Sequence, residues 1–481
     1  MNSPSFDFNR KAREEMIHEG FQPDFPPQVV KEVAYAQAAP VQNAVHRDMR
    51  GLLWSSIDNT QSRDLDQVEW VERLSNGNIR VLVGIADVDS VVTSNSATDA
   101  RARANATSVY TGGPVFPMLP ERLSTDLTSL SQDADRRAII MEFVVSPGGD
   151  VVCAEVCAAV LRNKAKLNYN QVAAWLGGAT APSLPSDLRE QLFLQQEASQ
   201  RLKKFRIERG ALTFGGVESI PLIVNNSVHG FDQIGQSASR DIIESFMIAA
   251  NVSMAQFLRR QNFLCLRRIV RTPKRWDRIQ AISAEAGTKL PDAPDSKALG
   301  DFLAAQKQSH PDTFPELSLA VLKALGPGEY VVEHPGSEHE GHFGLAVDDY
   351  THSTAPNRRY ADLIMQRLLK AAIQKQPRPL SEAQLSDLAA HCTERETAAR
   401  HVERFMKKVA AAILLAPQVG KTFDAIVTGA SNKGTFARLL AVPAEGRILH
   451  GEKGLDVGDK TRVKLISVDP QKGFVDFDAA R

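Results

Sequence analysis

Three carboxylates lie within nine residues, at Asp58, Asp64 and Asp66, directly after the apolar run 52–54 and before another candidate strand. Hard divalent cations prefer carboxylate oxygens, and Mg²⁺ combines one or two protein carboxylates with waters and substrate phosphates. The segment therefore indicates a hydrolytic magnesium site. An acidic, solvated turn is the alternative that this segment alone leaves open.

A calcium-binding loop is a poorer interpretation of the same residues. Such a loop would place Asp58 at its first position and Glu69 at its twelfth. Its sharp turn requires glycine at the position where this chain has Arg63. The pattern therefore favours Mg²⁺.

The composition is that of an ordinary globular protein. Of 481 residues, 43% are hydrophobic and 24% are charged, which supplies material for a large catalytic body and at least one smaller domain. Lys and Arg together number 57, as do Asp and Glu, so the formal net charge is zero. Any surface that binds a polyanion must therefore concentrate positive charge locally, inside a channel, while the outer surface compensates.

Several features predict a cytoplasmic protein without a membrane partner. The cysteines at 153, 157, 265 and 392 are scattered, and none has zinc-ligand spacing with histidine, so they are predicted to be reduced core residues. Residues 1–13 are polar and charged, and no window of the chain has the uninterrupted apolar length of a membrane span.

The elements that must position the acidic segment predict an α+β fold. Residues 1–47 are expected to form a helical appendage. Residues 48–416 are expected to form the catalytic domain, with a mixed sheet and long helices. The clearest expected elements are helices over 9–20, 240–260 and 381–415 and strands over 79–86 and 138–145.

Residues 417–481 show a different periodicity, with short alternating strands. The segments are 422–427, 434–440, 462–468 and 473–477, with a glycine-containing turn at 451–458. Five or so short strands in ~60 residues predict a small barrel of the oligonucleotide-binding (OB) type. A generic β-rich tail is the alternative.

The acidic segment resembles the signature of the ribonuclease II/ribonuclease R (RNB) family of 3′→5′ exoribonucleases, and similar blocks follow in order along the chain. The carboxy-terminal segment resembles the S1 RNA-binding barrel of that family. The two amino-terminal cold-shock domains of longer members do not fit into 47 residues. The colinear blocks are Ile85–Val88, Thr107–Tyr110, Phe116–Ser124, Ala165–Val172, Arg209–Phe214, Ile243–Asn251 and His342–Ile364.

The resemblance implies roles for the acidic residues. Asp58, Asp64 and Asp66 match three of the four catalytic aspartates of the family; the first two would organise Mg²⁺, with Mn²⁺ as an alternative, and Asp66 would be the most critical for cleavage. The fourth position departs from the family, because Gln67 replaces a second consecutive aspartate. An amide oxygen approaches a cation but carries no charge, so metal affinity or pH dependence is expected to change.

The resemblance also implies RNA-binding residues. Arg358 matches the arginine that neutralises the scissile phosphate, and Arg359 is a further candidate RNA contact. Tyr169 and Phe214 match aromatic residues that stack on the last bases of the strand, and Glu244 matches a glutamate near the RNA 3′ end. Taken alone, an arginine pair is more often a solvated surface patch, and aromatic residues such as Tyr169 and Phe214 are more often core packing. The alternative for Glu244 is an ordinary helix-start charge.

Two basic runs, within 201–209 and 267–278, have two interpretations. In one interpretation they line a path for RNA and neutralise its phosphates. In the other they are solvated faces of helices.

The resemblance implies a hydrolytic, metal-dependent exoribonuclease that shortens single-stranded RNA from its 3′ end and releases 5′-mononucleotides. A narrow channel would explain the preference for single strands. The alternative is an RNA-binding regulator that keeps the fold and the barrel but has lost turnover through Gln67. Protein partners are not predicted by any feature of the chain.

Overall fold

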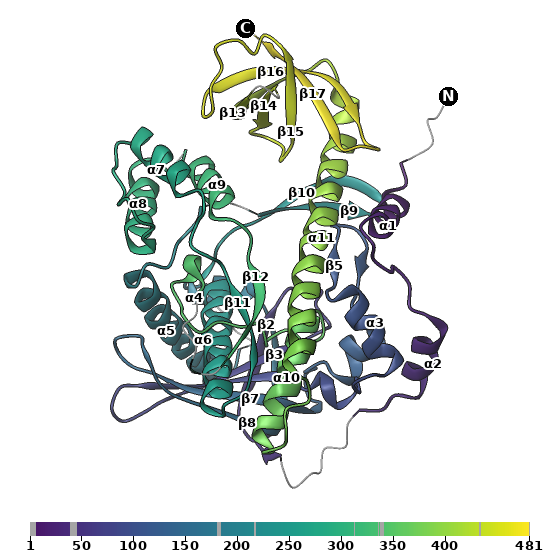
Figure 1. Ribbon diagram of the computed structural model, residues 1–481, viewed down its shortest axis with the longest axis vertical. Coiled ribbons are helices and arrows are strands. Elements are labelled where there is room, and N and C mark those ends of the chain that lie inside the picture. The colour runs from purple at the N-terminus through teal and green to yellow at the C-terminus, as the bar shows by residue number, and fades with distance from the viewer. Residues whose placement is uncertain are drawn as a thin grey trace.

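The computed structural model describes residues 6–38, 46–179, 184–215, 218–311, 313–334, 336, 341–431 and 434–480. Figure 1 shows a body of sheet and helices, a long helix that rises from it, and a small β-barrel at the far end of that helix. The predicted α+β class and the predicted carboxy-terminal barrel are both confirmed.

Six strands form the main sheet: β1 (Arg47–Asp48), β2 (Trp54–Asp58), β3 (Gln67–Arg73), β4 (Ile79–Ala86), β7 (Asp135–Val145) and β8 (Val151–Asn168). Their order is β1-β8-β2-β3-β4-β7, and β7 also pairs with β8, so five of the strands form a ring of neighbours. The first part of the long strand β8 pairs antiparallel with β7, and its last residues pair parallel with β2.

The interior of this ring is filled with apolar side chains. β4 is buried along almost its whole length, as expected of a strand covered on both faces. Gly84 lets the side chain of Leu161 in β8 pack directly against the backbone of β4. A Cβ atom at position 84 would lie only 2.6 Å from Leu161 Cδ2. The ring is therefore a packed scaffold that fixes the ends of β2 and β3.

Four helices pack on the sheet and share its main apolar core: α4 (Tyr169–Leu176), α5 (Ser186–Glu208), α6 (Ala238–Arg260) and α10 (Tyr360–Ile373). The side chain of Ser237 caps α6 by accepting a hydrogen bond from Arg240 N, which satisfies a free donor of the first turn. The helix predicted over 240–260 is confirmed, and it begins two residues earlier, at Ala238.

The amino-terminal helices pack against later parts of the chain. α1 (Phe8–His18) buries Phe8, Ala12 and Met16 in a second apolar cluster with residues of α11 (Glu382–Leu415). α2 (Pro27–Tyr35) contacts α3 (Ala97–Asn105). Short elements accompany them: η1 (Val88–Ser90), β5 (Val109–Tyr110), β6 (Val115–Phe116) and the π-helix η2 (Arg122–Leu127).

A third group of elements is formed by residues that lie between α6 and α10 in the chain or just before α6. α7 (Trp276–Glu285), α8 (Ser296–Ser309) and α9 (Phe314–Leu325) form a separate apolar cluster. Two pairs of strands lie near them in the chain. β9 (Glu218–Val224) and β10 (Ser227–Ile234) form a hairpin, whereas β11 (Cys265–Ile269) pairs antiparallel with β12 (Glu329–Glu333) across the segment that contains α7–α9. The 3-10 turn η3 (Phe343–Leu345) precedes the loop into α10.

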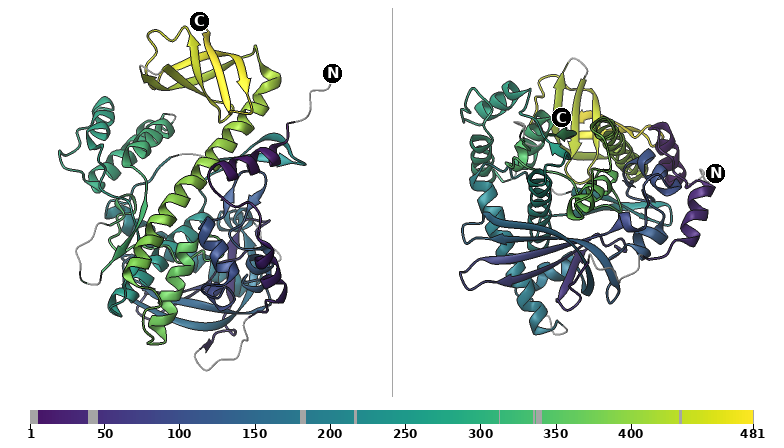
Figure 2. Two further views of the ribbon diagram at one scale, coloured as in Figure 1. Left: turned by 45° about the vertical axis from the view of Figure 1, so that its right-hand side comes forward. Right: turned by 60° about the horizontal axis from the view of Figure 1, so that its bottom comes forward.

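The long helix α11 begins at a capping box in which Ser381 and Gln384 bond each other's backbone. The turn η4 (Ala416–Gln418) leads from it into the barrel. The left view of Figure 2 shows the barrel at the upper end of this helix. The barrel is closed in the order β13-β14-β15-β17-β16. Its strands are β13 (Thr422–Ser431), β14 (Gly434–Leu439), β15 (Glu445–His450), β16 (Lys460–Asp469) and β17 (Phe474–Ala480).

No helix within the described ranges has both the length and the apolar character that crossing a membrane requires.

Candidate active site

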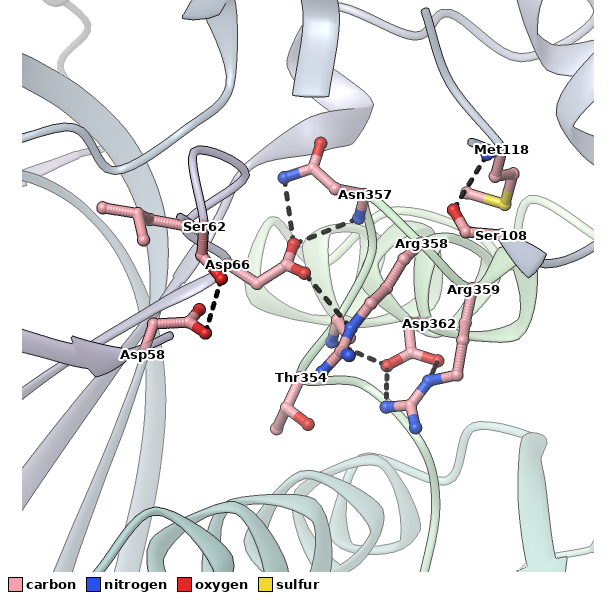
Figure 3. Close-up of polar contacts among 12 residues, drawn as sticks. Asp58, Ser62, Asp66, Ser108, Met118, Thr354, Asn357, Arg358, Arg359 and Asp362 are labelled. Atoms are coloured by element: carbon pink, nitrogen blue, oxygen red, sulfur yellow. Dashed lines mark hydrogen bonds and ion pairs between the residues drawn. The ribbon is translucent and has the colours of Figure 1, made fainter. Parts of the chain in front are cut away.

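The acidic segment is the connection between β2 and β3, two adjacent strands of the ring. β2 ends at Asp58, whose Oδ1 accepts hydrogen bonds from Ser62 Oγ at 2.8 Å and from Asn59 N at 2.6 Å. Figure 3 shows Asp58 and Ser62 on one side of this connection and Asp66 beside Asn357. The loop therefore delivers its carboxylates to one edge of a rigid sheet.

Asp66 is only 2% exposed and is held by a residue far along the chain. Its Oδ1 accepts hydrogen bonds from Asn357 N at 3.1 Å and from Asn357 Nδ2 at 2.9 Å. The hydroxyl of Thr128 lies 2.7 Å from the amide oxygen of Asn357 and fixes the amide in that orientation. Asp66 therefore occupies a prearranged position.

Arg358 lies on the other side of Asp66. Its Nε is 3.7 Å from Asp66 Oδ2, and its side chain is half exposed. Figure 3 shows the guanidinium directed toward Asp66. A half-exposed guanidinium beside a buried carboxylate presents donors to a phosphate without leaving the site.

Burial raises the pKa of Asp66 to about 7, although the charge of Arg358 and the hydrogen bond from Asn357 oppose this increase. Burial also raises the pKa of Asp64, and the nearby charge of Asp58 adds to it. Carboxylates that disfavour one another's ionisation form a site that a divalent cation stabilises.

The donor set fits a hard cation, because it consists of carboxylate oxygens. Among the described residues, however, the only group of three whose ligand atoms already lie within 4.8 Å of one another is Glu15, His18 and Glu19 at the end of α1. A cation held by Asp58, Asp64 and Asp66 would therefore need bridging waters or small side-chain movements. Mg²⁺ characteristically keeps several waters.

Gln67 is the first residue of β3 and is 7% exposed. The hydrogen bond from Ala86 N to Asp66 O extends the strand pairing by one residue. Because successive side chains on a strand point to opposite faces, Gln67 and Asp66 face away from each other. The role of Gln67 as a metal ligand stays a prediction.

Tyr169, the first residue of α4, lies beside the acidic centre. Its ring centroid is 4.3 Å from the guanidinium carbon of Arg240. Burial raises the pKa of Tyr169 to about 12, and the charges of Asp58 and Glu69 contribute. The predicted stacking residue is therefore near the candidate metal site.

The other predicted RNA contacts lie in different surroundings. Phe214 is partly buried against the α7–α9 cluster. Glu244 on α6 is half exposed, 4.0 Å from Arg206 Nη2. Arg359 donates to both carboxylate oxygens of Asp362, at 2.8 and 2.7 Å, so its guanidinium already has an internal partner. Their roles in binding RNA stay predictions.

Neither interpretation of the second basic run is right for its first members. Arg267 and Arg268 are 1% and 4% exposed. Arg267 forms ion pairs with Glu333 and Asp349, and Arg268 pairs with Glu396 at 2.8 Å. These arginines therefore belong to the interior.

Two residues at the site were missed by the sequence analysis. Asn357 lies inside the block His342–Ile364, so the resemblance marked its surroundings, but its contact with Asp66 gave no signal, because an amide has no distinctive spacing with an aspartate 291 residues away. Tyr110 lies at the end of a block that carried the family resemblance, so a signal existed. It is 43% exposed, and it lines a cavity of about 230 Å³ together with Arg358, Arg359 and Arg400.

Comparisons with known proteins identify two regions. The RNB domain matches residues 46–375, and the RNase II-type exonuclease C-terminal S1 domain matches residues 421–480. Ribonuclease R 1 of Lactococcus lactis is 29% identical over 493 residues, an alignment that covers 95% of this chain and 59% of that protein. The chain thus spans less than two thirds of this relative's length.

Solved structures share the fold. RNase R of Mycoplasma genitalium, solved with ribose-methylated single-stranded RNA, is similar with a TM-score of 0.91 at 23% identity, covering 98% of this chain and 78% of that chain. A yeast pseudonuclease is similar with a TM-score of 0.72 at 16% identity, covering 93% and 56%. At such identities the likeness shows the fold alone, and activity must be argued from the site.

Proposed function

The chain belongs to the RNB family, and from that premise we propose that it is a cytoplasmic, Mg²⁺- or Mn²⁺-dependent 3′→5′ exoribonuclease that hydrolyses single-stranded RNA to 5′-mononucleotides. The observation that carries the proposal is the position of Asp66, buried between Asn357 and Arg358 at the loop that also bears Asp58 and Asp64. The names of the relatives and the matching S1 domain support RNA as the substrate.

Each side chain has a task in this proposal. Arg358 binds the scissile phosphate and neutralises the charge that builds up during cleavage. Asn357 holds Asp66 in place, while Asp58 and Asp64 would hold the cation. When bound, a divalent cation polarises the phosphoryl group and lowers the pKa of a bound water.

The preference for single strands follows from stacking and space. Tyr169 offers an aromatic face beside the acidic centre, and stacking accepts every base because each has a π-face. A strand must present separated bases to such a platform. Equal degradation of a blunt duplex and of its separated strand would count against this part of the proposal.

The decisive experiment is a time course on a 5′-labelled single-stranded RNA with Mg²⁺. The wild-type protein is compared with Asp66→Asn, which keeps the shape of the side chain and removes its charge. We expect stepwise shortening from the 3′ end, lost in the variant and in the presence of a chelator. RNA that is bound but keeps its length with Mg²⁺ and with Mn²⁺ would refute the enzymatic proposal.

That second outcome would favour the alternative, an RNA-binding regulator with the RNB fold and little or no turnover. One observation favours this alternative: Gln67 removes a carboxylate from the expected set of four. The occurrence of the same fold in a yeast pseudonuclease is consistent with it.

We also propose the division of the chain into residues 1–47, 48–416 and 417–481. The end of α11 at Leu415 supports the second boundary, whereas the first boundary divides β1, which spans Arg47–Asp48. The first part has its own helices, but α1 shares an apolar cluster with α11.

A further inference from the structure

The end of α1 brings three side chains that can bind a metal ion to one place. Glu15, His18 and Glu19 are spaced three and four residues apart, so they share one face of the helix. One ligand atom from each lies within 4.8 Å of the other two, and no other group of three or more within the described ranges has this property. An imidazole nitrogen with carboxylate oxygens is a ligand set typical of Zn²⁺.

The distances within this group suit a shared ion better than direct contact. His18 Nδ1 lies 3.7 Å from Glu15 Oε1 and 3.7 Å from Glu19 Oε1, which is too long for a hydrogen bond. Ligand atoms at about 2.0 Å from a tetrahedral Zn²⁺ ion are about 3.3 Å apart. Shifts of a few tenths of an ångström would therefore close the three groups around an ion.

A second histidine approaches from α11, which packs beside α1 (Figure 1). His401 Nδ1 lies 3.7 Å from Glu19 Oε2, so an imidazole is present at each oxygen of the Glu19 carboxylate. The carboxylates of Glu15 and Glu19 are largely covered, whereas the side chains of His18 and His401 are 75% and 49% exposed and have space to rotate. Rotation of His401 would supply a fourth ligand.

The surroundings leave negative charge at this group. The carboxy-terminal end of a helix carries partial negative charge on its free carbonyl oxygens, which favours a cation. Of the basic side chains nearby, Arg395 donates to the backbone oxygen of Glu19, and the ion pair of Lys11 is with Glu14 at 4.0 Å. Lys11 acts on Glu15 only as a more distant charge. A bound cation would complete the charge balance.

We propose that Glu15, His18, Glu19 and His401 form a Zn²⁺ site that clamps α1 to α11. Imidazole and carboxylate together suit a borderline transition metal, whereas the oxygen ligands of the candidate active site suit Mg²⁺. A metal that joins segments far apart in the chain closes a long loop and adds to the stability of the apolar cluster between the two helices. The inference is independent of the proposed function, because it uses none of the residues of the acidic segment.

The test is a calorimetric titration of Zn²⁺ into the full-length protein in excess Mg²⁺. Wild type is compared with His18→Ala, with His401→Ala and with the control His450→Ala. His450 also lies beside a carboxylate, 2.8 Å from Asp478 Oδ1, but it belongs to no group of three potential ligands among the described residues. Zn²⁺ should bind about tenfold or more weakly to the first two variants, because each loses a direct ligand, and with unchanged affinity to the control.

Hydrogen exchange distinguishes a clamp from binding at the surface of one helix. Zn²⁺ should slow the exchange of the α1 amides in wild type and in His450→Ala, but not in His401→Ala. If His18→Ala binds Zn²⁺ as tightly as wild type, an adventitious ion only is bound and the site is refuted. If His401→Ala keeps both the affinity and the slower exchange, the clamp is refuted. Neither result bears on the proposed nuclease, whose test is RNA cleavage with Mg²⁺.

Discussion

At the scale of single residues, Asn357 is the group that fixes the position of the Asp66 carboxylate in the acidic site. It bonds Asp66 through both its backbone and its side chain, and Thr128 orients its amide. An aspartate at position 357 would have the same size, but its side chain could not donate and would bring a second negative charge to Asp66.

We therefore expect Asn357→Asp to lower the single-turnover rate of RNA cleavage by about 10²-fold, the size of effect typical of a lost electrostatic contact at an active site. RNA affinity should change little, because the binding groups Arg358 and Tyr169 remain. Thr128→Val is the milder comparison, since it leaves Asn357 in place and removes the hydroxyl that contacts both the amide and Leu123 O. An unchanged rate in Asn357→Asp would show that the position of Asp66 does not limit cleavage.

The sequence predicted the acidic residues because their spacing and their resemblance to a family are local properties of the chain. The contact of Asn357 with Asp66 and the buried state of Glu69 were not predictable in this way, since both depend on contacts between distant segments. Arg359 shows the limit of the resemblance: its block matched, yet the side chain is paired with Asp362.

At the scale of elements, the long periodic segments were predicted well and the short ones poorly. The expected helix 381–415 is α11, Glu382–Leu415, and the expected strand 79–86 is β4, Ile79–Ala86. The strand β15 was missed, because its six residues lie in a glycine-containing region and pair only within the closed barrel. Tertiary pairing, rather than local pattern, decides such elements.

The contact between α1 and α11 yields a prediction about stability. Phe8 is completely buried in the cluster that joins the two helices. Phe8→Ala should weaken the docking of α1 by about 3 kcal/mol through lost burial and a cavity. Hydrogen exchange of the α1 amides should accelerate correspondingly. Ile17→Ala, at a 58% exposed position of the same helix, is the control and should leave that exchange nearly unchanged.

The segment before α10 contains His342, and we expect this residue to make the folded protein less stable in acid. Burial lowers the pKa of His342 to about 4, and the charge of Arg268 contributes. Its Nδ1 accepts a hydrogen bond from Leu345 N at 3.2 Å, which requires that nitrogen to be unprotonated. Below its unfolded pKa near 6.5, the unfolded chain binds a proton that the folded chain excludes, so stability falls as the pH decreases.

Between pH 7 and pH 5 this group should cost the folded state about 2 kcal/mol. Denaturant unfolding of wild type and of His342→Asn at several pH values checks this. The variant should lose less stability over this interval than wild type does. Parallel losses in the two proteins would show that His342 is not the titrating group.

At the scale of the whole molecule, the sequence predicted the order of the two main parts and the long helix between them, but not the other contacts between body and barrel. A single helix, α11, runs from the body to the barrel, as Figures 1 and 2 show. A second contact is an ion pair between Arg438 of the barrel and Glu316 of α9. The sequence of neither surface indicates that it contacts the other, so such contacts could not be predicted.

The balanced net charge gives the last prediction, because a protein with 57 basic and 57 acidic residues binds RNA only if local groups neutralise phosphates. For a single strand, the logarithm of the affinity should fall with the logarithm of the salt concentration, with a slope of about −0.7 per neutralised phosphate. Three such contacts would weaken binding roughly 20-fold between 50 and 200 mM salt. Fluorescence anisotropy in an Asp66→Asn background measures this without cleavage.

Two further substitutions in that background separate charge from stacking. Arg358→Ala should make the slope less steep by about 0.7, because one phosphate contact is lost. Tyr169→Ala should weaken binding by about 1–3 kcal/mol at every salt concentration and leave the slope unchanged, because base stacking releases no counterions. If Arg358→Ala left the slope unchanged, Arg358 would not be a phosphate contact, and its proximity to Asp66 would serve only to balance that charge.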